Sequence, residues 1–169
     1  LTRLYTPADF GLVALFAAVV GSISPAICGK YEVAIVVAKS AEDGKQLLGL
    51  AFSMAMALSL TVFIGVWFFG EALLALLNAQ RLGGWVLLVP LALLFNGLVA
   101  SLNYYSNRQR EYGIISQSKV LAALLGVVIS ITLGLFGLHY GLLISSIIAT
   151  FSVGLWLLFR YQAILNKTV

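Results

Sequence analysis

Five long apolar stretches occupy most of this chain and constrain its fold more than any other feature. They cover residues 10–29, 47–69, 85–102, 120–138 and 140–159. A helix needs roughly 20 residues to cross the hydrocarbon core of a bilayer, which is about 30 Å thick. Because no water is present there to bond the backbone, such segments must be helical. The stretches therefore predict an all-α, polytopic transmembrane helical bundle with five spans.

The composition supports a membrane protein. Hydrophobic residues make up 62% of the 169 residues and charged residues only 9%, whereas about a quarter of a typical soluble chain is charged. No basic run is interleaved with aromatic residues, so we expect no nucleic-acid partner. The chain is predicted to be a single transmembrane domain over residues 1–169. Its spans, including their polar ends, are expected at about 10–38, 41–69, 85–107, 115–136 and 140–161.

The distribution of cations predicts how the spans are threaded. One side of the predicted topology carries Lys39, Lys45, Arg108, Arg110, Lys119, Arg160 and Lys167. The other side carries only Arg3 and Arg81. Because lysine and arginine accumulate in cytoplasmic loops, the N-terminus should face outward and the C-terminus the cytoplasm. Residues 1–5 read like the exit of an earlier helix, so we expect a fragment that lacks at least one upstream span.

Two capping boxes predict helix starts. Thr6 and Asp9 flank Pro7 just ahead of the first apolar stretch, and Ser40 with Asp43 repeats the spacing before the second. In a capping box, each of the two side chains bonds the backbone N–H of the other residue. Proline at the first helical position has no N–H to leave unpaired.

Small residues recur every four positions on three spans. They are Gly49, Ser53, Ala57, Thr61 and Gly65 in the second span, Gly126, Ser130 and Gly134 in the fourth, and Ser146, Thr150 and Gly154 in the fifth. In lipid, small side chains let helices approach closely, so these faces are predicted to be seams of the bundle. The alternative is that such smooth faces allow helices to slide during a transport cycle.

Pro25 predicts a kink in the first span. The kink either fits the shape of the bundle or opens and closes a cavity, as broken helices do in transporters. Shortly after it, Lys30, Tyr31 and Glu32 interrupt the apolar run. In a continuous helix over 10–38, Lys30 would lie roughly 9–12 Å from the helix midpoint, inside the membrane. It either snorkels to the interface or faces a water-filled cavity.

Residues 30 and 32 lie about 200° apart on a helix, so only one of them can face a cavity squarely. The other is expected to pair with a neighbouring helix. Asn96 in the third span is expected to hydrogen-bond across helices. Near the cytoplasmic boundary, cations either set the orientation or attract anionic headgroups. The candidate substrate-binding residues are Lys30, Tyr31, Glu32, Asn96, Asn103, Arg108 and Lys119.

Motifs of covalent catalysis and cofactor binding are missing from the sequence. It has no Ser–His–Asp set and no Gly-rich phosphate loop followed by lysine. Cys28 and His139 are the single cysteine and histidine, and neither has the neighbours that a metal site needs. We therefore expect neither an enzyme nor a metal or cofactor site.

Several segments resemble one family in the right order. They are LTRLYTPADFG at 1–11, GKYEVAI at 29–35, the turn from Lys39 to Asp43, and YYSNR at 104–108 leading to ISQSKV at 115–120. Together they resemble bacterial polysaccharide flippases of the O-antigen type. These belong to the exporter group that also contains multidrug and toxin extrusion proteins and the lipid II flippase. The resemblance covers essentially the whole chain, as helices two to six.

The resemblance implies most of one six-helix lobe of a transporter in the bacterial inner membrane. Such a transporter would flip polyprenyl-pyrophosphate-linked oligosaccharide to the periplasmic leaflet for surface polysaccharide such as lipopolysaccharide. Lys30, where family members often carry arginine, would supply cavity charge, and Arg108 or Lys119 would gather the headgroup. The expected partners are the lipid-linked oligosaccharide, membrane lipids and the missing helices of the full-length chain.

Two alternatives stay open. A cation-coupled drug exporter of the same fold would need a carboxylate inside the lobe, and Glu32 and Glu71 are predicted to lie away from its centre. A membrane subunit that does not transport would use the small-residue faces only for packing.

Overall fold

The computed structural model describes residues 4–76, 80–138 and 140–167, and every regular element in this part is helical. The elements are α1 (Pro7–Ile23), η1 (Ser24–Ala26), α2 (Tyr31–Val37), α3 (Ala41–Leu76), η2 (Gln80–Leu88), α4 (Val89–Arg108), α5 (Tyr112–Leu135) and α6 (Gly141–Lys167). Among the described residues, five helical segments are long and apolar enough to cross a membrane. The predicted all-α polytopic bundle is confirmed.

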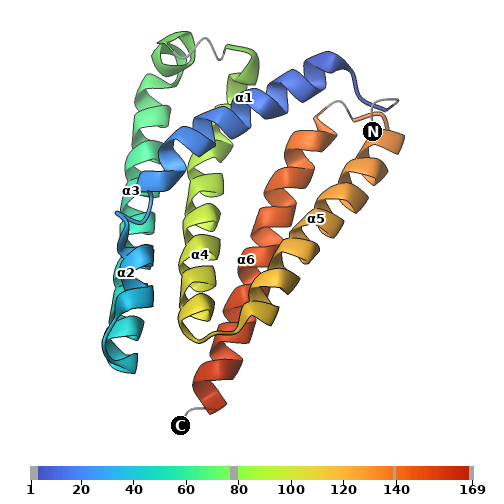
Figure 1. The fold of residues 1–169 in the computed structure, drawn as a ribbon. Coiled ribbons are helices and arrows are strands. Elements are labelled where there is room, and N and C mark those ends of the chain that lie inside the picture. Colours follow the sequence, from blue (N-terminus) through green and yellow to red (C-terminus); the bar gives the residue numbers. More distant parts are fainter. Residues whose placement is uncertain (1–3, 77–79, 139, 168–169) are drawn as a thin grey trace.

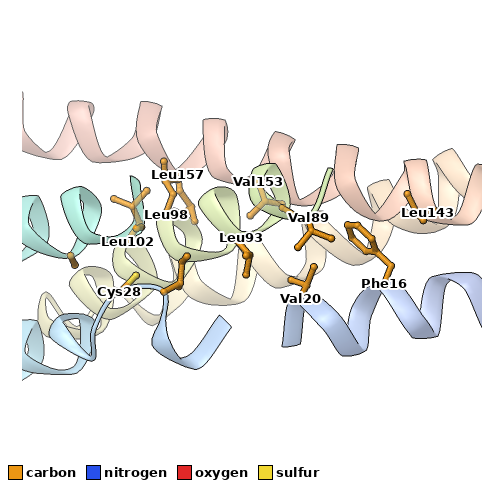
Figure 2. Close-up of a cluster of buried hydrophobic side chains, with 14 of the residues drawn as sticks. Phe16, Val20, Cys28, Val89, Leu93, Leu98, Leu102, Leu143, Val153 and Leu157 are labelled. Atoms are coloured by element: carbon orange, nitrogen blue, oxygen red, sulfur yellow. The ribbon is translucent and has the colours of Figure 1, made fainter. Parts of the chain in front are cut away.

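Helix α4 forms the centre of the bundle. On one side lie α2 and α3, on the other lie α6 and α5, and α1 runs obliquely across α4 and α6 (Figure 1). Of an 18-residue apolar stretch in the span that contains α4, 44% is buried, against 17–33% for the corresponding stretches of the other four spans. Figure 2 shows the core along α4, where Leu93, Leu98 and Leu102 pack with side chains of α1 and α6 such as Phe16 and Leu157.

Both predicted capping boxes are confirmed. The Asp9 carboxylate accepts a hydrogen bond from the Thr6 amide at 2.9 Å, and Thr6 Oγ1 accepts one from the Asp9 amide at 3.4 Å. The matching bonds between Ser40 and Asp43 measure 3.1 and 3.0 Å. These side chains satisfy amides that the first turn of a helix cannot satisfy itself.

Tyr5 attaches the segment before α1 to the α5–α6 pair. Its hydroxyl donates to the carbonyl of Ser130 at 2.6 Å, and its ring lies against Gly134 and Gly141. Burial, together with the nearby Asp9 carboxylate, raises the pKa of the Tyr5 phenol. The hydroxyl therefore stays protonated and remains a donor at neutral pH.

The first span differs from the predicted continuous helix over 10–38. The kink lies at Pro25 as expected, but α1 ends at Ile23 and α2 begins only at Tyr31. Gly29 and Lys30 between them have φ of +58° and +66°. Two consecutive left-handed residues cannot continue a right-handed helix, so the chain breaks completely instead of bending.

The small-residue prediction is right in part for α5 and α6 and wrong for α3; Gly126, Ser146 and Thr150 are only half-buried. Ser130 and Gly134 of α5 and Gly154 of α6 are buried between helices. On α3, Gly49, Ser53, Ala57 and Thr61 are exposed. The buried stripe of α3 is instead Ala51, Ala55 and Ser59, which has the same four-residue spacing. Spacing alone could not choose between the two stripes.

Two helix ends offer a matched test of backbone strain. Arg110 after α4 and Gly137 after α5 both have left-handed φ, +61° and +72°. In each turn, the next amide donates to a carbonyl five residues earlier, at 2.9 and 3.1 Å. A left-handed conformation costs a side-chain-bearing residue about 1–2 kcal/mol. This cost exceeds the free energy that glycine loses because its more flexible chain must be ordered on folding.

We therefore expect Arg110→Gly to raise the free energy of unfolding by about 0.5–1 kcal/mol. The reverse substitution, Gly137→Arg, should lower it by a similar amount. The apparent melting temperature of the detergent-solubilised protein measures both effects. Equal melting temperatures for both variants and the wild type would contradict the assignment of strain to these turns.

Candidate functional site

The break between α1 and α2 follows the first apolar span, Pro7–Ala26, and places Lys30, Tyr31 and Glu32 at its end. Its backbone stays hydrogen-bonded through two tight turns, with N···O distances of 2.9 and 3.0 Å. Such a break at membrane depth is tolerated where the backbone groups find partners or line a cavity. The turn therefore presents side chains while the amides of Gly29 and Tyr31 stay hydrogen-bonded.

Lys30 and Glu32 lie on different faces, as their spacing predicts. Lys30 and Tyr31 are exposed, whereas Glu32 is only 8% exposed and shares the buried face of α2 with Ile35. This face packs against α3 and α4. Within the described residues, Glu32 Oε2 has no hydrogen-bond partner, so the predicted pairing with a neighbouring helix is not made by that oxygen. Glu32 is thus more central than expected.

The turn is fixed to α4 just before Lys30. The Cys28 side chain, labelled in Figure 2, is completely buried. Its Sγ lies 3.4 Å from Ser101 Oγ and 3.5 Å from the carbonyl of Gly97. A Cβ on Gly97 would come within 3.3 Å of both Cys28 and Ile27. Because Gly97 has no side chain, the turn can pack closely against α4 at this position.

Arg108 ties the other end of α2 to α4. Its Nη2 donates to the carbonyls of Ala38, at 3.2 Å, and Ser40. Its guanidinium also covers Gly44 at the start of α3. A carbonyl at the end of a helix has no partner within the helix, so Arg108 gives the Ala38 carbonyl a donor. The Ser40 carbonyl also accepts a hydrogen bond from the Gly44 amide at 3.2 Å, and Arg108 is its second donor.

Asn103 and Lys119 lie between α4 and α5. Asn103 Oδ1 accepts a hydrogen bond from Ser118 Oγ at 3.3 Å, which joins the two helices. Lys119 follows Ser118 in α5 and is exposed. The predicted site residues are therefore spread over several elements: Lys30 ends the α1–α2 break, Arg108 ends α4, and Lys119 lies in α5.

Asn96 lines a groove between α1, α4 and α6 that has a volume of about 280 Å³. Its Nδ2 donates to the carbonyl of Ala92 at 2.8 Å, a bond within α4 and not the cross-helix bond that we predicted. Ser146 and Thr150 of α6 face it across the groove, and Phe16 and Ser24 complete its lining from the N-terminal side.

Sequence reasoning missed Ser24, Ser146 and Thr150 as companions of Asn96. The last two belong to the small-residue face of the fifth span, so their common face could be predicted. Which helix they meet depends on how α1 crosses the bundle. No metal cluster of three or more His, Cys, Asp or Glu side chains occurs among the described residues, and His139 lies outside them.

Comparisons with known proteins give one result. The sequence pattern of a family described as polysaccharide biosynthesis protein matches residues 1–168. No curated protein and no solved structure matches the chain. Because the match spans nearly every residue, it applies to the whole helical bundle and not to one motif. The chain belongs to the polysaccharide biosynthesis protein family.

Proposed function

We propose that the chain forms most of one lobe of a flippase in the bacterial inner membrane. The flippase would move polyprenyl-pyrophosphate-linked oligosaccharide from the cytoplasmic to the periplasmic leaflet. The observation that carries this proposal is Lys30, an exposed cation in the helix break that follows the first apolar span, in a chain of the polysaccharide biosynthesis family. Ionisable residues at membrane depth usually mark a transport pathway, and we place Lys30 at the cytoplasmic end of such a pathway.

The chemistry of Lys30 suits a pyrophosphate. Charge-assisted hydrogen bonds to phosphate oxygens are about twice as strong as neutral ones, and an ammonium can contact several oxygens as a point charge. The lipid tail can stay in the bilayer while the headgroup passes along the protein. A membrane potential that is negative inside favours movement of negative charge to the outer side by about 2.3 kcal/mol per charge per 100 mV.

Replacing Lys30 tests the proposal. In the full-length protein, Lys30→Gln should lower export of surface polysaccharide at least about tenfold, because the pathway loses its cation. Lys30→Arg should keep most of the export, since the charge is kept. The measurement is surface polysaccharide per cell at equal amounts of membrane-inserted protein, together with the leaflet distribution of the lipid-linked oligosaccharide.

Two further variants separate charge from backbone and position. Lys30→Gly removes the charge while relieving the left-handed strain, so it should fail in export although the protein is at least as stable. Lys119→Gln removes an exposed cation of α5 and should have a much smaller effect. Normal export by Lys30→Gln would remove Lys30 from the mechanism.

The buried carboxylate of Glu32 favours a second candidate function, a cation-coupled drug exporter of the same fold. Such an exporter needs an acidic group inside the lobe, and Glu32 is buried between α2, α3 and α4 with one unpartnered oxygen. The two functions differ in a simple readout. Deleting the intact gene would raise intracellular drug accumulation in the second case and reduce surface polysaccharide in the first.

A further inference from the structure

The groove between α1, α4 and α6 is separate from Lys30 and differs from it in chemistry. Phe16, Ser24, Asn96, Ser146 and Thr150 line it, and no charged side chain is among its lining residues. It gathers three hydroxyls and one amide at one place in an otherwise apolar bundle. Polar groups at such depth need partners, either from the protein itself or from something that enters the groove.

The hydrogen bonds already made define what the groove can still bind. Ser146 Oγ donates to the carbonyl of Leu143 at 2.8 Å, and Thr150 Oγ1 donates to that of Ser146 at 2.9 Å. Both hydroxyl protons are thus used within α6, while the oxygen lone pairs stay available as acceptors. Asn96 Nδ2 uses one proton on Ala92 and keeps a second one to donate. The groove therefore offers several acceptors and a donor, without charge.

A sugar hydroxyl matches this pattern, because it donates and accepts at the same time. A phosphate does not match, because it is an acceptor that needs cations or several donors. The volume of about 280 Å³ lies just below the range of pockets for drug-sized ligands, roughly 300–1,000 Å³. It suits one sugar unit and not a whole oligosaccharide, and the Phe16 ring adds an apolar surface for the face of that unit.

The groove also lies at a different depth from Lys30. Asn96 is the eighth residue of α4, which continues the span that η2 begins, and Thr150 is the tenth of α6. The apolar spans that contain them are Gln80–Arg108 and Gly141–Gln162, so both residues, and the groove with them, lie near the middle of the membrane. Lys30 follows α1 on the way to the cytoplasmic side.

We infer that this groove binds one uncharged sugar unit of the lipid-linked oligosaccharide near the middle of the pathway. The inference rests on the proposed flippase function. The groove would hold the sugar unit after the pyrophosphate has left the cytoplasmic side. The sugar and the pyrophosphate would thus bind at separate sites. Asn96, Ser146 and Thr150 are the contacting residues.

Cysteine labelling in the full-length protein tests the groove directly. Thr150→Cys should react with a membrane-impermeant methanethiosulfonate reagent about tenfold faster than Val128→Cys, because the thiolate that reacts forms only in contact with water. Val128 is an exposed side chain of α5 that should face lipid. The wild-type protein supplies the blank, since Cys28 is completely buried. Purified lipid-linked oligosaccharide should slow labelling of Thr150→Cys at least about threefold.

The outcomes separate the inference from the proposed function. Labelling that is as slow as that of Val128→Cys overturns the inference, because lipid or another helix then covers the groove. Labelling without protection, in a preparation that flips the oligosaccharide, also overturns it and leaves the flippase function standing. If the wild-type protein moves no lipid-linked oligosaccharide, the proposed function fails and the inference fails with it. Fast, protected labelling in a flipping preparation supports both.

Discussion

Replacing Gly97 by leucine should destabilise the bundle by about 3 kcal/mol or more, since insertion of side-chain atoms into a packed core forces neighbours apart. A Cβ at this position would lie 2.9 Å from the Cβ of Ala55 in α3 and 3.3 Å from Cys28 Sγ and Ile27 Cγ2. All three neighbours are buried. Because they come from α3 and from the turn before Lys30, no single side-chain rotation can make the space.

Gly49→Leu is the matched control. Gly49 is also inside a helix, but, apart from its chain neighbours and the backbone of its own helix turn, no atom of the described residues lies within 4 Å of its Cβ position. There, leucine replaces glycine with a gain in helix propensity of up to about 1 kcal/mol. Apparent melting temperature and yield of membrane-inserted protein measure both variants. Equal behaviour of the two would show that Gly97 is not a point of close packing.

Gly97→Leu should also lose export, because the turn that precedes Lys30 packs against this glycine. Gly97→Ala provides a graded version, with a smaller loss of about 1–3 kcal/mol. If Gly97→Ala folds normally yet exports poorly, the close packing of the turn against Gly97 is needed for transport as well as for stability. Normal export at reduced stability would assign Gly97 to packing alone.

Local features of the fold were predictable because their causes are local. Apolar length fixes the number of spans, and the spacing of Thr6 with Asp9 and of Ser40 with Asp43 fixes two helix starts. Pro25 indicated where the first span departs from a straight helix. The complete break there was not predictable, because lysine at position 30 gives no sign of a left-handed backbone. Left-handed residues are usually glycine or asparagine.

Features that depend on the choice of a neighbour were not predictable. Helix α3 carries two small-residue stripes with identical spacing, and only contact with α4 selects Ala51, Ala55 and Ser59 as the buried one. The groove around Asn96 requires α1 to cross α4 and α6 obliquely. Periodicity predicts which residues share a face of a helix but not which helix that face contacts. Individual candidate residues could therefore be predicted, but not which of them lie together in one groove.

Arg108 shows the same limit and leads to the second large effect. Its charge near the cytoplasmic boundary predicted a residue that gathers headgroups, and the structure places its guanidinium on the carbonyls of Ala38 and Ser40. Replacing Arg108 by alanine leaves both carbonyls without this donor. Hydrogen bonds to charged groups contribute about 1.5–3 kcal/mol each, and the two bonds share one side chain, so we expect a total loss of about 2–4 kcal/mol.

Arg108→Lys and Lys119→Ala separate the two roles of Arg108. Lysine keeps the charge but lacks the planar fork that reaches two acceptors. If Arg108 acts through the α2–α3 connection, Arg108→Lys should stay destabilised and export poorly, and Lys119→Ala should behave like the wild type. If it acts by attracting headgroups, Arg108→Lys should restore export, and Lys119→Ala should lower it as Arg108→Ala does.

The physical reason to expect the first outcome is the way α2 is held. This helix has only seven residues, and isolated helices of that length are unstable in water without tertiary contacts. Its start is fixed by the turn at Cys28 and Gly97, and its end by Arg108. Releasing the end would let α2 move relative to α4 and carry Lys30 out of position, so loss of Arg108 should impair export even when the bundle remains folded. Thermal stability, protease sensitivity of the α2–α3 connection and surface polysaccharide, measured on the same variants, would show whether these effects occur together.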